Sequence, residues 1–152
     1  MSLDTITLAL DGDIPLDEFS RGLSLFNVLI RELTAEIGRD TQVNWSVESL
    51  ESGSAITTIK GDSERIEVVE EIVHAYLKVG RALQLHEPIP YPDKVAKPAR
   101  ELTELLNGHI KSVRFENPDE DVIIDSHYTL ATRAPAVSPV KAMGMVKGIV
   151  ET

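Results

Sequence analysis

The apolar residues of segment 16–37 constrain the fold of this chain more than any other feature. They recur at alternating steps of three and four, and they are Leu16, Phe19, Leu23, Phe26, Ile30, Leu33 and Ile37. This spacing places their side chains on one face of an α-helix. Pro15 suits the entrance of that helix, and Gly38 predicts a left-handed C-terminal stop. A helix with one apolar stripe requires a partner surface, which the neighbouring segments have to supply.

Strand patterns lie on both sides of this predicted helix. Apolar and polar residues alternate in segments 5–10 and 43–48, and segment 55–60 is rich in Ile and Thr. The short turn between the latter two segments predicts an antiparallel hairpin. Two further strands are expected at residues 110–116 and from residue 122 onwards.

Two more helices are predicted after the hairpin. Segment 66–83 carries an apolar stripe at helical spacing that includes Gly80. Glycine costs about 1 kcal/mol in a helix. Gly80 therefore marks either a close approach to a neighbouring backbone or a tolerated residue near the helix end, and both interpretations stay open. A shorter helix is expected to begin between residues 93 and 98.

These elements define an α+β fold with the order β-α-β-β-α-α-β-β. Short connections and right-handed crossovers then favour a variant of the ferredoxin-like split β-α-β arrangement. We expect a mostly antiparallel sheet with strand order 2-3-1-4-5 and with the helices stacked on one face. The other face of the sheet presents polar side chains.

The character of the sequence changes after residue 127. We expect an α+β domain over residues 4–127 and a linker over residues 128–142, where Ala and Pro are frequent. Residues 143–152 have apolar side chains amid glycines, as in a first strand. Because a lone strand is not stable, we expect this segment to begin a truncated second domain or to pair with another chain.

Composition excludes several classes of function. The chain has no cysteine and a formal net charge of −10. Without thiols it forms no disulfide, thiolate metal site or cysteine nucleophile. The acidic charge argues against binding the phosphate backbone of nucleic acids, which requires Lys and Arg. No apolar run is long enough for a bilayer, and no secretory signal is visible, so we expect a cytoplasmic protein with no membrane partner.

The densest acidic group lies along the last predicted strand. Alternation places Asp121 and Asp125 on one face, with His127 continuing it. Carboxylates and one imidazole are suitable ligands for a divalent cation in a hydrolase or nuclease. The alternative, which we favour, is an edge strand protected from pairing by its charges. Glycine-rich phosphate loops and helical zinc-binding histidine pairs are absent from the sequence, so we expect no cofactor.

Segments Pro88-Ile89-Pro90-Tyr91, 101–109, 112–116 and 47–55 resemble an uncharacterised bacterial family. In the members that this chain resembles, an N-terminal α+β region precedes a small β-rich domain. That domain begins with a Gly-x-Val-x-Gly-x-Val-Glu-like strand, similar to residues 144–151. The resemblance implies a truncated chain, and it provides no catalytic residues to carry over.

The hypothesis that we favour is a non-enzymatic interaction or regulatory domain of a larger bacterial protein. Its expected partner is another protein, its own C-terminal domain or a second copy of the chain. We place the contact surface on the polar sheet face and the hairpin tip, at Asn44, Ser46, Glu48, Ser52, Ser54 and Thr58. The aromatic residues Phe19, Phe26 and Trp45 are expected to belong to the core.

Overall fold

The structure is a computed structural model that describes residues 3–51 and 55–125. Some predictions fall outside the described residues: the linker over residues 128–142, the strand over residues 143–152, and the roles of Ser52, Ser54 and His127. The fold is α+β, and a short 3-10 helix, η1, precedes the fourth strand. The elements are β1 (Thr5–Gly12), α1 (Leu16–Gly38), β2 (Asn44–Glu51), β3 (Ala55–Asp62), α2 (Ile66–Gln84), α3 (Asp93–Glu104), η1 (Leu105–Asn107), β4 (Ile110–Glu116) and β5 (Asp121–Asp125).

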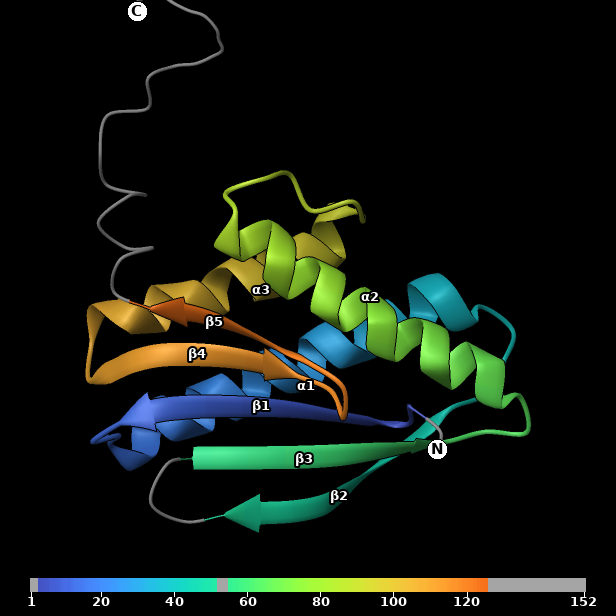
Figure 1. The fold of residues 1–152 in the computed structure, drawn as a ribbon, viewed down its shortest axis with the longest axis horizontal. Helices are drawn as coiled ribbons and strands as arrows, with labels where there is room; N and C mark the ends of the chain where they lie inside the picture. Colours follow the sequence, from blue (N-terminus) through green and yellow to red (C-terminus); the bar gives the residue numbers. More distant parts are fainter. Residues whose placement is uncertain (1–2, 52–54, 126–152) are drawn as a thin grey trace, which may run out of the picture.

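The strands form one 5-stranded sheet in the order β2-β3-β1-β4-β5, and every neighbouring pair is antiparallel (Figure 1). This is the order that the connections predict. β1 is the central strand, with β3 on one side and β4 on the other. Among the described residues, β2 and β5 each pair with a single strand and form the two edges of the sheet.

The core lies between one face of the sheet and the helices. Residues that the strand register places side by side on this face are buried, and they include Ile6, Leu8, Leu10, Val113, Phe115, Val122 and Ile124. α1 and α2 pack on this face, while α3 packs against α1 and α2 (Figure 1). Among the described residues, no helix has the length and apolar composition needed to span a bilayer.

The buried face of α1 is broader than the predicted stripe and is rotated from it. Gly22, Leu25 and Leu29 are buried although they lie outside the stripe. Leu16, the first residue of the helix, is 81% exposed, so its prediction as a packed residue is wrong. The reason is that α1 has several neighbours, namely α2, α3 and β1, and a helix enclosed on more than one side buries more than a single stripe.

The end of α1 also differs from the prediction. Gly38 is the last helical residue and is buried, whereas Arg39 takes the positive φ of 50°. The predicted left-handed glycine stop is therefore wrong by one residue. A non-glycine residue with positive φ is uncommon, because its Cβ crowds the backbone.

Close packing between α2 and β4 explains Gly80. A Cβ atom added to Gly80 would lie 2.8 Å from Cγ of Phe115. The close approach is thus real, but the neighbour is an aromatic ring and not a backbone. The ring of Phe115 stacks on Tyr76 at 4.8 Å between centroids, and Tyr76 also contacts Phe26 at 5.8 Å. The hydroxyl of Tyr76 donates to the carbonyl of Thr7 at 2.9 Å, and burial raises its pKa well above the ordinary value.

Candidate functional site

An apolar groove lies between α1 and the helix-side face of β2 and β3. It has a volume of about 510 Å³. Its walls combine apolar side chains with a few polar and basic ones at the rim. The lining residues are Leu23, Phe26, Asn27, Ile30, Arg31, Thr34, Ala35, Arg39, Thr41, Val43, Trp45, Ser46, Val47, Thr57 and Ile59.

The groove is open because the helices do not cover the outer part of the sheet. Val47 pairs with Ile59 and lies on the helix side, yet it is 65% exposed. Leu50, which pairs with the buried Thr57 on the same side, is 59% exposed. Apolar surface that would normally contact a helix is therefore accessible along β2. Clustered exposure of this kind is typical of a binding surface.

A β-bulge in β2 enlarges this apolar face. The pairing with β3 shifts between Val47 and Ser49, so Glu48 is an additional residue of the strand. Side chains alternate between the two faces of a strand, and one extra residue reverses the alternation beyond it. As a result, Leu50 lies on the helix side together with Trp45 and Val47. Simple alternation in the sequence would place Leu50 on the opposite face.

Trp45 forms part of the groove wall and is half-buried, so the prediction of a core residue is only partly correct. It pairs with Gly61 of β3, and a Cβ atom added to Gly61 would lie 2.9 Å from the indole ring. Glycine therefore provides the space that the ring occupies. The indole Nε1–H donates to the hydroxyl of Thr34 at 2.9 Å. That hydroxyl in turn donates to the carbonyl of Ile30 at 2.7 Å.

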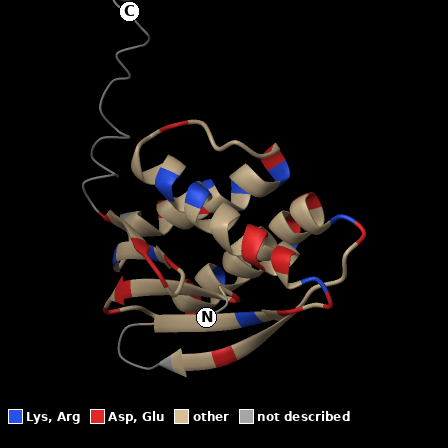
Figure 2. Cartoon of the chain, turned by 45° about the vertical axis from the view of Figure 1, so that its right-hand side comes forward, with Lys and Arg blue, Asp and Glu red and all other residues tan. Residues whose placement is uncertain are grey.

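The charge at the groove is opposite to the net charge of the chain. Its described lining residues include two arginines, Arg31 and Arg39, and no Asp or Glu. The chain as a whole has a formal charge of −10, and Figure 2 shows acidic residues distributed over helices and strands. Arg31 is 3.9 Å from Glu32, a loose pair, and Arg39 has no ion pair or side-chain hydrogen bond within residues 3–51 and 55–125.

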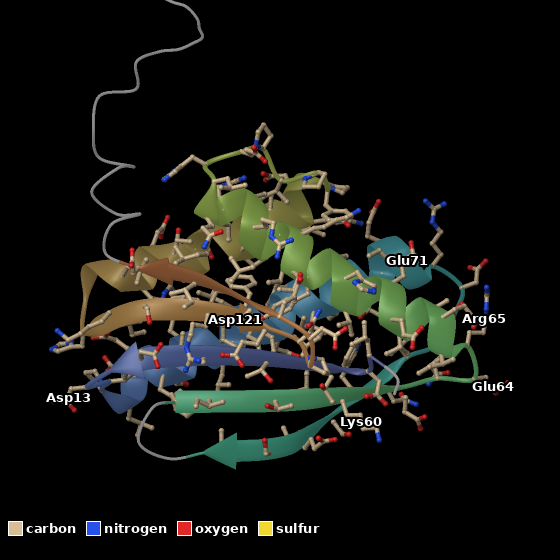
Figure 3. The ribbon with its side chains drawn as sticks, viewed as in Figure 1. Asp13, Lys60, Glu64, Arg65, Glu71 and Asp121 are labelled. Carbon is tan, nitrogen blue, oxygen red and sulfur yellow. The ribbon has the colours of Figure 1, made fainter. Side chains whose placement is uncertain are left out.

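A third arginine lies beside the end of the groove that is lined by Arg39 and Thr41. Arg65 precedes α2, where Figure 3 labels it next to Glu64. Its Nη1 donates to the hydroxyl of Thr41, a lining residue, at 3.5 Å, and its Nε contacts Glu67 at 3.1 Å. The end of the groove near Arg39 and Thr41 is thus polar and basic.

The floor of the groove contains an unusual buried hydroxyl. Thr57 is 4% exposed, and its Oγ1 is buried without a hydrogen-bond partner among the described residues. A buried hydroxyl without a partner costs free energy. No pattern in the sequence distinguishes this threonine from Thr58, which faces the other side of the sheet.

The polar face of the sheet carries part of the predicted interaction surface. Asn44, Ser46 and Thr58 lie on the face opposite the helices, as their register shows. The hydroxyls of Thr58 and Thr7 are 2.7 Å apart. Glu48 is exposed at the bulge, and Ser49 takes the place opposite Thr58. Whether this face binds a partner stays a prediction.

An ionic network occupies the same face further along the sheet. Arg114 of β4 donates through Nε to Asp11 at 2.9 Å and through Nη1 to Glu116 at 2.7 Å. The hydrogen bonds with Asp11 are the main reason why the pKa of Arg114 is raised. These side chains satisfy one another, so this network is explained by the stability of the sheet.

The acidic residues predicted for a metal site lie on one face of β5, with Asp121 at its start (Figure 3). Asp121 and Asp125 are four positions apart on an extended strand, which corresponds to about 13 Å. Direct ligation of one ion by both carboxylates would require a much shorter distance. The described residues contain no group of three or more His, Asp or Glu side chains arranged for a metal ion. The role predicted for His127 is untested.

The chain was compared with protein-family models, curated proteins and solved structures, and none of the three gives a match. The resemblance to an uncharacterised bacterial family therefore stays a prediction. The groove is the candidate site that the geometry supports best. Sequence patterns did not reveal it, since its walls are residues that the apolar periodicity assigns to the core.

Proposed function

We propose that this chain is a non-enzymatic binding domain whose binding site is the groove between α1 and the β2–β3 hairpin. The observation that carries the proposal is the exposure of Val47 and Leu50 on the helix side of an edge strand, beside a groove of about 510 Å³. Volumes of this size are typical of sites for small molecules and short chain segments. Such a site regulates a protein when ligand binding changes the contacts that the protein makes with its partner.

An apolar dye tests this proposal without knowledge of the natural ligand. Anilinonaphthalene sulfonate gains fluorescence on exposed apolar surface. We expect saturable binding of one dye per chain and its loss in Val47→Asp, which places a charge in the groove. Ile123→Asp is the matched control, because Ile123 is a strand residue that is 46% exposed away from the groove. Equal dye binding by both variants would show that the groove is not the site.

The polar sheet face provides a separate surface for a protein partner, as the sequence predicts. Asn44, Ser46, Glu48 and Thr58 are the described residues of the predicted surface. Self-association through it would appear in light scattering as a dimer that Asn44→Arg dissociates. A monomer at all concentrations would exclude a second copy as the partner.

We also propose that the fold is a ferredoxin-like variant. The support is the succession β1-α1-β2-β3-α2-β4 with antiparallel order β2-β3-β1-β4, to which α3 and β5 are additions. An experimental structure with a different strand order would contradict this assignment.

A further inference from the structure

We infer that the ligand of the groove is a long-chain carboxylate, that is, an unbranched alkyl chain with one anionic head group. The inference rests on the binding function proposed above and adds the chemical class of the ligand. It is carried by the shape of the groove, by its apolar end and by Arg39 at its other end.

The shape favours a single narrow chain. The lining residues of α1 extend from Leu23 to Ala35, a rise of about 18 Å along the helix axis, and Arg39 follows the end of this helix. The groove is elongated along this helix, and its volume of about 510 Å³ lies within the range of small-ligand pockets. A long alkyl chain fits this length and volume.

One end of the groove is suited to the alkyl chain. Leu23, Phe26, Val47 and Ile59 line it and carry no charge. In the wall beside them, the indole N–H of Trp45 already donates a hydrogen bond to Thr34, so it does not require a polar partner on the ligand. Burial of a chain against these side chains is favourable in proportion to the apolar area removed from water.

The other end is suited to an anionic head. Arg39 and Thr41 line it, and Arg31 lies about two turns earlier on α1, roughly midway along the groove. Paired N–H donors of arginine match the two oxygens of a carboxylate. Because the chain carries a net charge of −10, these cations do not simply reflect its composition. The head group therefore lies near Arg39, and the alkyl chain extends toward Leu23.

The head-group preference provides the test. Trp45 is the only tryptophan of the chain and lines the groove, so its fluorescence reports occupancy directly. The chain is titrated with palmitate, hexadecanol and hexadecyltrimethylammonium, each below its micelle concentration. We expect palmitate to bind most tightly and the ammonium compound least. Non-specific attraction to an acidic protein would give the reverse order, since it favours the cation.

Matched variants assign the preference to the groove. We expect Arg39→Gln to weaken palmitate binding about tenfold, the usual effect of losing one charge-assisted hydrogen bond, and to leave hexadecanol binding unchanged. Arg100→Gln is the control, because Arg100 is an exposed arginine paired with Asp93 on α3. Val47→Asp removes binding of both compounds. Circular dichroism confirms that each variant is folded.

Two results would overturn the inference. One is palmitate binding no tighter than that of the ammonium compound, and the other is an equal effect of Arg39→Gln and Arg100→Gln. Dye binding that still depends on Val47 would then show that the groove is a binding site for another class of ligand. If the unsubstituted chain binds neither the dye nor palmitate, the proposed function itself is refuted.

Discussion

The indole N–H of Trp45 donates a hydrogen bond of 2.9 Å to the hydroxyl of Thr34 and thereby connects the edge strand β2 to α1. Because Thr34 also donates to the carbonyl of Ile30, its hydroxyl is both donor and acceptor. The space above Gly61 accommodates the ring. The groove wall is therefore organised before any ligand binds, which lowers the entropic cost of binding.

Substitution of Thr34 by Val should disrupt this wall. Valine has the shape of threonine but leaves the indole N–H without its acceptor, and we expect a loss of about 1–2 kcal/mol in the free energy of unfolding. Urea denaturation followed by tryptophan fluorescence measures it. Thr34→Ser keeps the hydroxyl and should lose less. Equal stability of Thr34→Val and the unsubstituted chain would mean that water replaces Thr34 as the acceptor.

Thr57 and Thr58 should respond oppositely to the same substitution. In Thr57→Val, a buried hydroxyl without a partner is replaced by a methyl group, so we expect unchanged or higher stability, by up to about 1 kcal/mol. Thr58→Val removes a 2.7 Å contact with Thr7 and should lower stability. Thermal unfolding of the two variants gives the comparison. Destabilisation by Thr57→Val would indicate that its hydroxyl has a water partner.

Gly80→Ala should destabilise the protein although alanine is the better helix former. The added Cβ would lie 2.8 Å from Cγ and 2.9 Å from Cβ of Phe115, atoms that cannot swing away from the backbone. We expect a net loss of about 1–3 kcal/mol from overpacking. Gly22→Ala is the control, since its nearest neighbour is the terminal Cδ1 of Leu10, which can move. Similar losses in both variants would contradict this reasoning.

Glu18 predicts a specific response to acid. Its Oε2 lies 2.7 Å from Nδ1 of His109, and its Oε1 accepts the backbone N–H of that residue at 3.1 Å. These hydrogen bonds, the side-chain one first, lower the pKa of Glu18 below 4.5. A carboxyl group whose pKa is lower in the folded state stabilises that state above 4.5, and the contribution is lost as the pH falls through the lowered value.

We therefore expect Glu18→Gln to be less stable than the unsubstituted chain near neutral pH, and the difference to shrink as the pH falls below 4.5 and through the lowered pKa of Glu18. Urea denaturation at a series of pH values from neutral to acid measures the difference. Glu104→Gln is the control, because Glu104 is exposed at the end of α3. A difference that persists at low pH would show that the carboxylate charge is not responsible.

The sequence predicts the elements well because each depends on local periodicity. The segments of β1, α1, the β2–β3 hairpin and α2 were all identified, and the strand order followed from their short connections. What could not be predicted depends on neighbours in space. The wider buried face of α1 results from contacts with α2 and α3, and the position of Leu50 results from a bulge that alternation alone does not reveal.

The candidate site escaped prediction for a related reason. Phe26, Ile30 and Trp45 have the periodicity of core residues, and only the three-dimensional structure shows that the sheet extends beyond its helical cover. The sequence does not predict Arg39 as a site residue, because Gly38 before it matches the glycine expected at the end of the helix. Alternation correctly places Asn44 and Ser46 on the polar face of the sheet. This face is the side of β2 opposite Trp45 and Val47, which line the groove.

The bulge at Glu48 lets the groove tolerate one change in chain length in an evolutionary sense. Deletion of this one residue would remove the bulge and leave Leu50 on the helix side, because Val47 and Leu50 would then be two positions apart on a regular strand. A lineage that uses the groove can therefore have either the present spacing with a bulge or a spacing one residue shorter without it. Apolar residues at positions 47 and 50, together with glycine at position 61 and arginine at position 39, are a signature by which distant relatives with the same binding site can be recognised.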